Sequence, residues 1–187
     1  MFAIKTARAF DGEQQLPGGA TLLIDDGRDR RDSTGGSTPA RKLRIVEFPH
    51  ATVLPGLIDT HVHLGGDGRD GADVGRTHRA GVKIVTGTDG GISTAKPHGI
   101  VSTGISMLVA SGISAADALA SATSIAAQVC GLGSCKGRLR TGYDAGLLFV
   151  DGDPLSDIGA LSRPAAVMVR GRWAIQSAAE WTGLGQP

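Results

Sequence analysis

The chain has 187 residues, of which 41% are hydrophobic and 20% are charged. This length suits one modest domain or a split pair, and the hydrophobic share excludes a wholly disordered chain. With 19 basic and 18 acidic residues the net charge is +1, which provides no field to attract nucleic acid or an anionic membrane surface. We therefore expect a globular protein that binds neither nucleic acid nor membranes.

No secretion or membrane-spanning segment is evident in the sequence. The first residues lack a charged start followed by an apolar run. The longest nearly uncharged stretch, residues 97–119, is interrupted too often by glycine and polar residues to cross a bilayer. We expect a cytoplasmic protein in which Cys130 and Cys135 are free thiols.

Small strands are predicted in the first part of the chain. Residues 2–9, 20–25 and 43–48 form short, partly alternating apolar runs separated by glycine, proline and aspartate, which is typical of antiparallel strands. Residues 27–42 are charged and rich in glycine, serine and threonine, which predicts an exposed loop.

The middle of the chain has the pattern of buried parallel strands. Residues 51–58 and 82–86 are almost continuously apolar, as expected for strands covered on both faces. The 17 residues from 65 to 81 include six glycines and leave room for one short helix around residues 72–79.

Helices and then further strands follow. Residues 100–111 predict a helix that ends at Gly112, and a longer helix begins after the N-cap residue Ser114 and runs to Cys130. Strand patterns return at residues 147–150, 165–169 and 173–175.

A histidine pair follows the first buried strand. His61 and His63 are two residues apart, so strand alternation would point both imidazoles to one side, where they can share a metal ion. Neutral imidazole suits zinc, iron, nickel or cobalt, and Asp59, on the same face, is a candidate partner of this metal site. On spacing alone, two satisfied surface histidines are an equal alternative.

An aspartate follows the second buried strand. Asp89 lies in the glycine-rich sequence GTDGG at residues 87–91. Catalytic groups gather at the carboxyl ends of parallel strands, so Asp89 is a candidate metal ligand and a candidate general base for a water molecule. The alternative is a turn residue whose side chain hydrogen-bonds its own backbone.

Four stretches together resemble the metal-dependent amidohydrolase superfamily, in particular its imidazolonepropionase-like and prolidase-like branch. They are LPGLIDTHVHL, GVKIVTGTDGG, SAADALASATSIAAQVCGL and KGRLRTGYDAGLLFVDGDPLSDIGAL, and they occur in the family's order. The resemblance implies a small β-sandwich built from both ends of the chain, with a (β/α)8 barrel between them that carries the metal site.

The resemblance also implies roles for individual residues. His61 and His63 match the metal-binding HxH after the first barrel strand. Asp89 matches the aspartate after the eighth strand, which binds metal and takes the proton of the attacking water. The implied cofactor is a divalent metal, with zinc first. His98 resembles a position that faces substrate, with an ordinary loop histidine as the alternative.

The chain departs from the family in its length. A (β/α)8 barrel takes about 250 residues, whereas 17 residues separate the regions that resemble strands one and eight. Strands two to seven are missing, together with the lysine and the later histidine ligands that the family places after them. The candidates His78, His50, Lys83 and Lys96 do not replace these ligands convincingly.

The predicted fold class is therefore α/β with a β-sandwich: a urease-like composite sandwich plus a severely truncated (β/α)8 barrel. Residues 1–53 and 139–187 form the two parts of the sandwich, and residues 54–138 are the barrel remnant with strands one and eight and the C-terminal helices. Two parallel strands cannot close a barrel and their edges invite pairing, so we expect a homo-oligomer.

The predicted function is hydrolysis of a non-peptide carbon–nitrogen bond in a small-molecule amide or lactam, through a metal-activated water. The alternative is a catalytically inactive, truncated homologue that acts as a structural or interaction module. This alternative predicts little bound metal and exposed apolar surface at Val53, Leu57, Ile84 and Val85.

Overall fold

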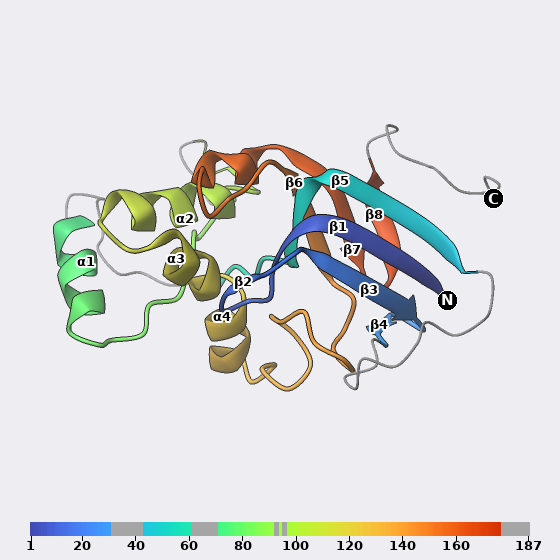
Figure 1. Cartoon of the computed structure of the whole chain (residues 1–187). Helices are drawn as coiled ribbons and strands as arrows, with labels where there is room; N and C mark the ends of the chain where they lie inside the picture. Colours follow the sequence, from blue (N-terminus) through green and yellow to red (C-terminus); the bar gives the residue numbers. More distant parts are fainter. Residues whose placement is uncertain (31–42, 61–70, 92–93, 95–96, 177–187) are drawn as a thin grey trace.

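The computed structural model describes residues 1–30, 43–60, 71–91, 94 and 97–176. Within these residues the chain has a mixed α/β structure, in which the strands gather at one end of the molecule and the helices at the other (Figure 1). None of the described helices is long and apolar enough to cross a membrane.

The described strands form one eight-stranded sheet in which the two ends of the chain meet. The order is β4 (Arg28–Asp29), β3 (Ala20–Asp25), β1 (Phe2–Phe10), β5 (Arg44–Pro55), β6 (Leu147–Asp151), β7 (Pro164–Val169) and β8 (Arg172–Gln176), and the short β2 (Gln15–Leu16) pairs with β1. At the centre, β5 is parallel to β1 and antiparallel to β6. The sheet therefore depends on both the N-terminal and the C-terminal strands.

β5 is one long strand where the sequence predicts two. Its first half alternates between buried and exposed side chains, whereas residues 51–55 are all buried, as their apolar pattern predicts. The halves are joined because β1 pairs with both of them, with an irregularity in the register between Thr6 and Arg8. The prediction of antiparallel pairing holds for β1 with β3 but is wrong for β1 with β5.

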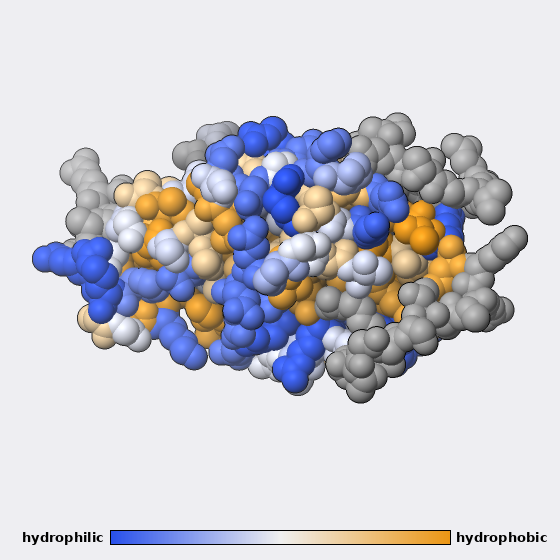
Figure 2. Space-filling model, in the orientation of Figure 1, coloured by the Kyte–Doolittle hydropathy of each residue, from blue (hydrophilic) through white to orange (hydrophobic). Residues whose placement is uncertain are grey.

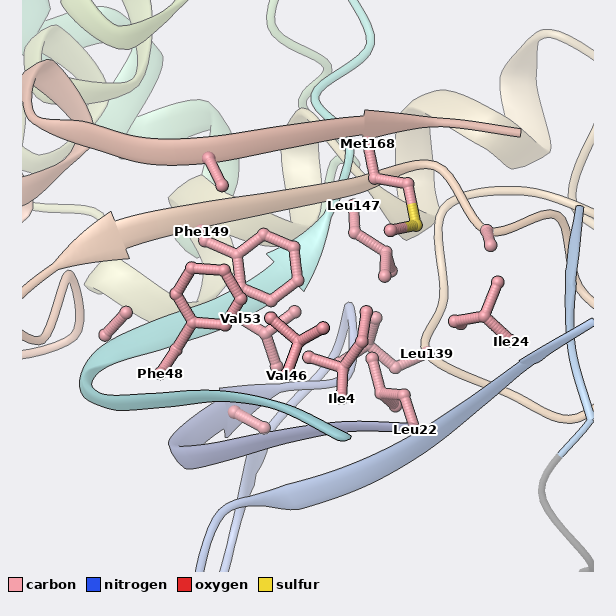
Figure 3. Packing of buried hydrophobic residues seen from close by; sticks show 14 of the residues in the cluster. Ile4, Leu22, Ile24, Val46, Phe48, Val53, Leu139, Leu147, Phe149 and Met168 are labelled. Carbon is pink, nitrogen blue, oxygen red and sulfur yellow. The ribbon is translucent and has the colours of Figure 1, made fainter. Parts of the chain in front are cut away.

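The sheet curls around a hydrophobic core that the two halves of the sheet enclose (Figure 3). The rings of Phe48 and Phe149 stack there with centroids 4.5 Å apart, and Trp173 packs against Phe149 at 5.6 Å. The turns before β4 and β8 meet at Gly27 and Gly171, where a Cβ on Gly171 would lie 2.8 Å from the Gly27 Cα. Both glycines have positive φ, so space and backbone conformation favour glycine here.

A second hydrophobic core lies between the sheet and the helices. The helices are α1 (Gly71–Arg79), α2 (Val101–Ala110), α3 (Ala115–Ser121), α4 (Ser124–Val129) and the 3-10 helix η1 (Ile158–Ser162). Side chains of β6 alternate between the cores, with Phe149 in the first and Leu148 and Val150 in the second. This double burial explains why β6 is apolar throughout its first four residues.

The predicted helices are present, but the longest is interrupted. α1 and α2 confirm the helices expected around residues 72–79 and 100–111, and Ser114 caps α3, its Oγ accepting the Asp117 N–H at 3.1 Å. The expected helix from Ser114 to Cys130 is instead α3 and α4. The carbonyls of Ser121 and Ala122 accept backbone N–H groups from distant segments, which ends α3 at that point.

The predicted strand at residues 82–86 is wrong: the structure assigns no strand there. Val82 is 51% exposed, while Ile84 and Thr86 are buried at 4% each. A parallel strand forms by backbone hydrogen bonds to a neighbouring strand. At Thr86, however, the backbone N–H donates to the Ser121 carbonyl of α3, 3.0 Å away.

Candidate functional site

Part of the predicted site lies in the described residues. Asp89 and His98 are described, whereas His61 and His63 fall outside the described residues. β5 ends at Pro55, and Thr60, the residue before His61 in the sequence, is 7% exposed. The expected alignment of the two imidazoles by strand alternation therefore stays a prediction.

Thr60 and Thr86 join the two segments that carry the predicted site. The Thr60 backbone N–H donates to the Thr86 carbonyl at 3.0 Å, and the Thr60 hydroxyl donates to the same oxygen at 2.7 Å. Both threonines are buried. The two residues are 26 positions apart, so the tertiary fold, rather than local sequence, brings the segment before His61 beside the segment before Asp89.

Asp59 makes a second connection between the same segments. Its Oδ1 accepts the Thr88 backbone N–H at 2.8 Å, and its Oδ2 accepts the Thr88 hydroxyl at 2.5 Å. Thr88 immediately precedes Asp89 in the chain. The sequence pairs Asp59 with the histidine metal site, and the structure shows that Thr88 is a partner of this carboxylate.

Buried polar groups at the end of α3 form hydrogen bonds with both the segment before His61 and the segment before Asp89. The Ser121 carbonyl accepts the Thr86 N–H, and the Ala122 carbonyl accepts the Ile58 N–H at 2.8 Å. The hydroxyls of Thr86 and Ser121 are 2.6 Å apart, and the Ser121 hydroxyl donates to the Ala118 carbonyl. Since Ser121 has one hydroxyl hydrogen, Thr86 is the donor in the pair.

These polar residues are the part of the site that sequence reasoning missed. Hydrophobic patterning treats Thr86 as an ordinary strand residue, Thr88 as part of the glycine-rich sequence around Asp89, and Ser121 as a helix residue. The available signal is the run TGTDG at residues 86–90, in which two threonines precede the candidate aspartate. It shows that hydroxyl donors are present but not which acceptors they reach.

Asp89 lies in a tight turn, as its glycine-rich surroundings predict. It is half-buried and has a φ of 52°, a left-handed conformation that aspartate tolerates better than most non-glycine residues. His98 is exposed, and its ring lies over Gly91, where an added Cβ would be 2.2 Å from the His98 Cε1. The role of His98 toward substrate stays a prediction.

The other candidate donors have different surroundings. His78 Nε2 lies 3.8 Å from Asp117 Oδ2, where α1 approaches α3, and these two residues help to line a small cavity of about 130 Å³. Cys130 and Cys135 are free, as expected. Within the described residues, no group of three or more His, Cys, Asp and Glu side chains could hold a metal ion.

The comparison with family sequence models identifies the class of protein. The model of the amidohydrolase family matches residues 68–174, which is more than half of the chain and includes Asp89. The chain belongs to the amidohydrolase family. A comparison with curated proteins gave no match.

Solved structures place the chain in the prolidase-like branch of this family, as the sequence resemblance implies. A Xaa-Pro dipeptidase with methionine bound in its active site is 29% identical, with a TM-score of 0.52 over 55% of this chain and 25% of its own. The A. niger ochratoxinase is 25% identical, with a TM-score of 0.50 over 58% of this chain and 25% of its own.

A third structure matches over a greater length. A candidate prolidase from Bifidobacterium longum has a TM-score of 0.66 over 92% of this chain and 94% of its own, at 15% identity, which shows a shared fold alone. By contrast, the chain covers a quarter of the length of the dipeptidase and of the ochratoxinase.

Proposed function

We propose that this amidohydrolase-family chain is a metal-dependent hydrolase that breaks a non-peptide carbon–nitrogen bond in a small amide or cyclic amide. The observation that supports this proposal most directly is the pair of connections Thr60–Thr86 and Asp59–Thr88. They hold the segment that leads into His61 beside the turn that carries Asp89.

The donors present are of the right kind for a divalent metal. Two imidazoles and one carboxylate are a set that zinc takes in catalytic sites, where three protein ligands leave one position open. Of this set the structure describes Asp89, whereas His61 and His63 lie outside the described residues. His61, His63 and Asp89 would hold the ion, with zinc as the first candidate. A divalent ion supplies Lewis acidity, which lowers the pKa of water and polarises a carbonyl.

The chain's own residues supply the proton transfer. In the proposed reaction the Asp89 carboxylate takes a proton from the attacking water as the water oxygen bonds to the carbonyl carbon. Asp89 then gives this proton to the leaving nitrogen as the carbon–nitrogen bond breaks, so Asp89 ends the cycle as it began. The exposed imidazole of His98, beside Gly91 in the same loop, is our candidate contact for substrate.

The substrate class is argued from the family and its neighbours. A small-molecule amide or lactam is the substrate we propose. The dipeptidase similarity adds Xaa-Pro dipeptides to the compounds to test, and their turnover would assign the chain to peptide-bond hydrolysis instead. Because the chain covers a quarter of that dipeptidase, the neighbour's own activity is a guide to the assay and nothing more.

The competing proposal is an inactive, truncated homologue that serves as a structural or interaction module. The short match to the dipeptidase favours it. One of its expectations is wrong in part: Val53 and Ile84 are 0% and 4% exposed, and Leu57 and Val85 are half-buried. Ile84 belongs to the second core and Leu57 packs against it, whereas Val53 belongs to the first core.

Assembly, location and domain division are further parts of the proposal. We propose a cytoplasmic homo-oligomer that binds neither nucleic acid nor membranes, with sandwich parts at residues 1–53 and 139–187 around a truncated barrel at 54–138. Support for self-association comes from exposed apolar side chains, including Val169 and Ile175 near the β8 edge at 55% and 56% exposure. Figure 2 shows apolar surface at both ends of the visible face.

Metal content separates the two functions. We would purify the full chain and a His61→Ala/His63→Ala variant by size exclusion and measure zinc and the other divalent metals per chain by elemental analysis. Near-stoichiometric metal that disappears in the variant, followed by turnover of an amide or lactam, supports the hydrolase. Metal no higher than in the variant overturns it and favours the inactive module. Circular dichroism of both proteins checks that the variant folds.

A further inference from the structure

We propose that Asp59 is a positioning residue that holds Asp89 in place through Thr88, so that losing its two hydrogen bonds weakens metal binding although Asp59 is not itself a ligand. This inference rests on the proposed function, because it assumes that Asp89 binds metal. It concerns the residues 59, 88 and 89, all of which the structure describes.

The first step is the geometry of the contact. Asp59 accepts from the backbone N–H and from the side-chain hydroxyl of one residue, Thr88. The Thr88 N–H belongs to the Gly87–Thr88 peptide, so the two bonds to one carboxylate hold both the backbone that enters Thr88 and the Thr88 side chain. Two contacts restrict the rotation of Thr88, the residue before Asp89, more than a single hydrogen bond would.

The second step is the backbone conformation that follows. Asp89 has a φ of 52°, which costs energy for a residue with a side chain and persists where neighbouring contacts determine it. The Asp59–Thr88 contact restrains Thr88, the residue whose carbonyl forms the peptide that enters Asp89. Asp59 therefore contributes to the backbone conformation from which the Asp89 carboxylate extends.

The third step separates positioning from stability. Thr60, Thr86 and Ser121 already anchor the two segments through buried hydrogen bonds. The Asp59–Thr88 contact lies at the exposed end of this network, and exposed polar pairs contribute little to folding. An exposed contact next to the candidate ligand thus has its main consequence for that ligand.

The metal-free protein provides the first test. In Asp59→Ala, hydrogen–deuterium exchange at the Thr88 amide should accelerate, because its acceptor is gone, while exchange at the buried Thr60 amide should be unchanged. Asp153→Ala is the matched control, since Asp153 also accepts one backbone N–H, from Leu155 at 3.0 Å, and one hydroxyl, from Ser156 at 3.3 Å. Equal exchange at Thr88 in Asp59→Ala and in wild type overturns the proposal.

Zinc affinity provides the second test, by competition of the full chain with a chromophoric chelator. Loss of a group that orients a metal ligand typically weakens binding by about 10- to 100-fold, which is the effect expected for Asp59→Ala. Asp153→Ala should bind as wild type does. Asp59→Asn should rescue binding to within about threefold, because the amide oxygen still accepts the Thr88 N–H and the amide nitrogen can donate to the Thr88 hydroxyl.

The outcomes distinguish this inference from the function on which it rests. If wild type binds zinc and Asp59→Ala binds equally well, the positioning role is wrong and the hydrolase proposal stands. If Asp59→Asn is as weak as Asp59→Ala, the carboxylate acts as a ligand or by its charge, and positioning is again wrong. If wild type binds neither zinc nor another divalent metal, the hydrolase proposal fails, and exchange at the Thr88 amide still decides whether Asp59 holds the turn.

Discussion

At the scale of single residues, Asp89 is the side chain on which the proposed chemistry depends. We expect Asp89→Asn to lower kcat by about 10²- to 10⁴-fold, because an amide can still offer an oxygen to a cation but cannot carry the proton. The measurement is turnover of whichever amide or dipeptide wild type hydrolyses, with zinc content determined in parallel. Asp153→Asn, which changes the same group outside the site, is the control. Full activity in Asp89→Asn would remove Asp89 from the mechanism.

Phe149 is a residue whose truncation should cost much of the protein's stability. It is 0% exposed and stacks on Phe48 within the first core (Figure 3). Phe149→Ala should lower the free energy of unfolding by about 3–5 kcal/mol through lost burial and the cavity left behind. Urea denaturation measures the change, with Met107→Ala, at a 54% exposed position, as the control. A loss below about 1 kcal/mol would mean that the core collapses around the gap.

At the scale of single residues, the sequence predicts which side chains are candidates for chemistry, but not which groups they contact. The glycines around Asp89 predict its turn, and the structure has one there. The partners of Asp59 and Ser121 could not be predicted, because Thr88 and Thr86 lie 29 and 35 positions away from them. Nothing in a local pattern encodes such separations.

At the scale of elements, α3 shows how strongly a local signal can act. Ser114 Oγ accepts the Asp117 N–H, and the Ser114 hydroxyl lies 2.7 Å from Asp117 Oδ2. Ser114→Ala should destabilise the protein by about 1 kcal/mol, since a helix N–H loses its acceptor. Ser114→Thr keeps the acceptor and should restore most of the stability. Thermal denaturation followed by circular dichroism compares them, and equal midpoints for wild type and Ser114→Ala would contradict the capping role.

The loop from Lys136 to Asp144 contains a pH-dependent contact. The Asp144 carboxylate accepts a hydrogen bond from the Lys136 ammonium group at 2.6 Å, which lowers the pKa of the Asp144 carboxyl, and Arg28 adds to this effect. A pKa lower in the folded than in the unfolded chain means that the contact stabilises the fold above the unfolded pKa of about 4. That stabilisation is lost as the pH falls through the folded pKa.

The difference between wild type and Asp144→Asn measures this contribution. At pH 7 the variant should be less stable by about 1 kcal/mol, the upper end for an ion pair near the surface. The two free energies of unfolding should converge as the pH falls below 4, because wild type then becomes protonated as well. Urea titrations at several pH values give the comparison, and a gap that widens toward low pH would contradict the assignment.

Elements with a local cause are predicted well, and those with a distant cause are not. The end of α2 before Gly112 and the start of α3 after Ser114 follow from local capping signals, and the short segment before residue 81 leaves room for α1. The break after Ser121 arises because its carbonyl serves Thr86 instead of its own helix. The same bond explains why residues 82–86 lack a strand: their apolar pattern correctly marks Ile84 as buried, but the neighbour is a helix end.

At the scale of the whole molecule, the two hydrophobic cores share their central strands. Val53 and Leu54 of β5 belong to different cores, as do Phe149 and Val150 of β6. If β5 or β6 unfolds, side chains of both hydrophobic cores become exposed to solvent. Because β5 comes from the N-terminal part and β6 from the C-terminal part, the two ends of the chain must be present together for the fold to form.

We therefore expect one cooperative unfolding transition for the sheet and the helices together. Trp173 packs against Phe149 and reports on the first core by fluorescence, once Trp181→Phe removes the second tryptophan of the chain. Circular dichroism at a helix-sensitive wavelength reports on the helices over the second core. In urea the two signals should have the same midpoint, because β5 and β6 transmit the loss of either core to the other. A helical signal that disappears at lower urea than the fluorescence would show that the helical end, with the turn that carries Asp89, unfolds by itself.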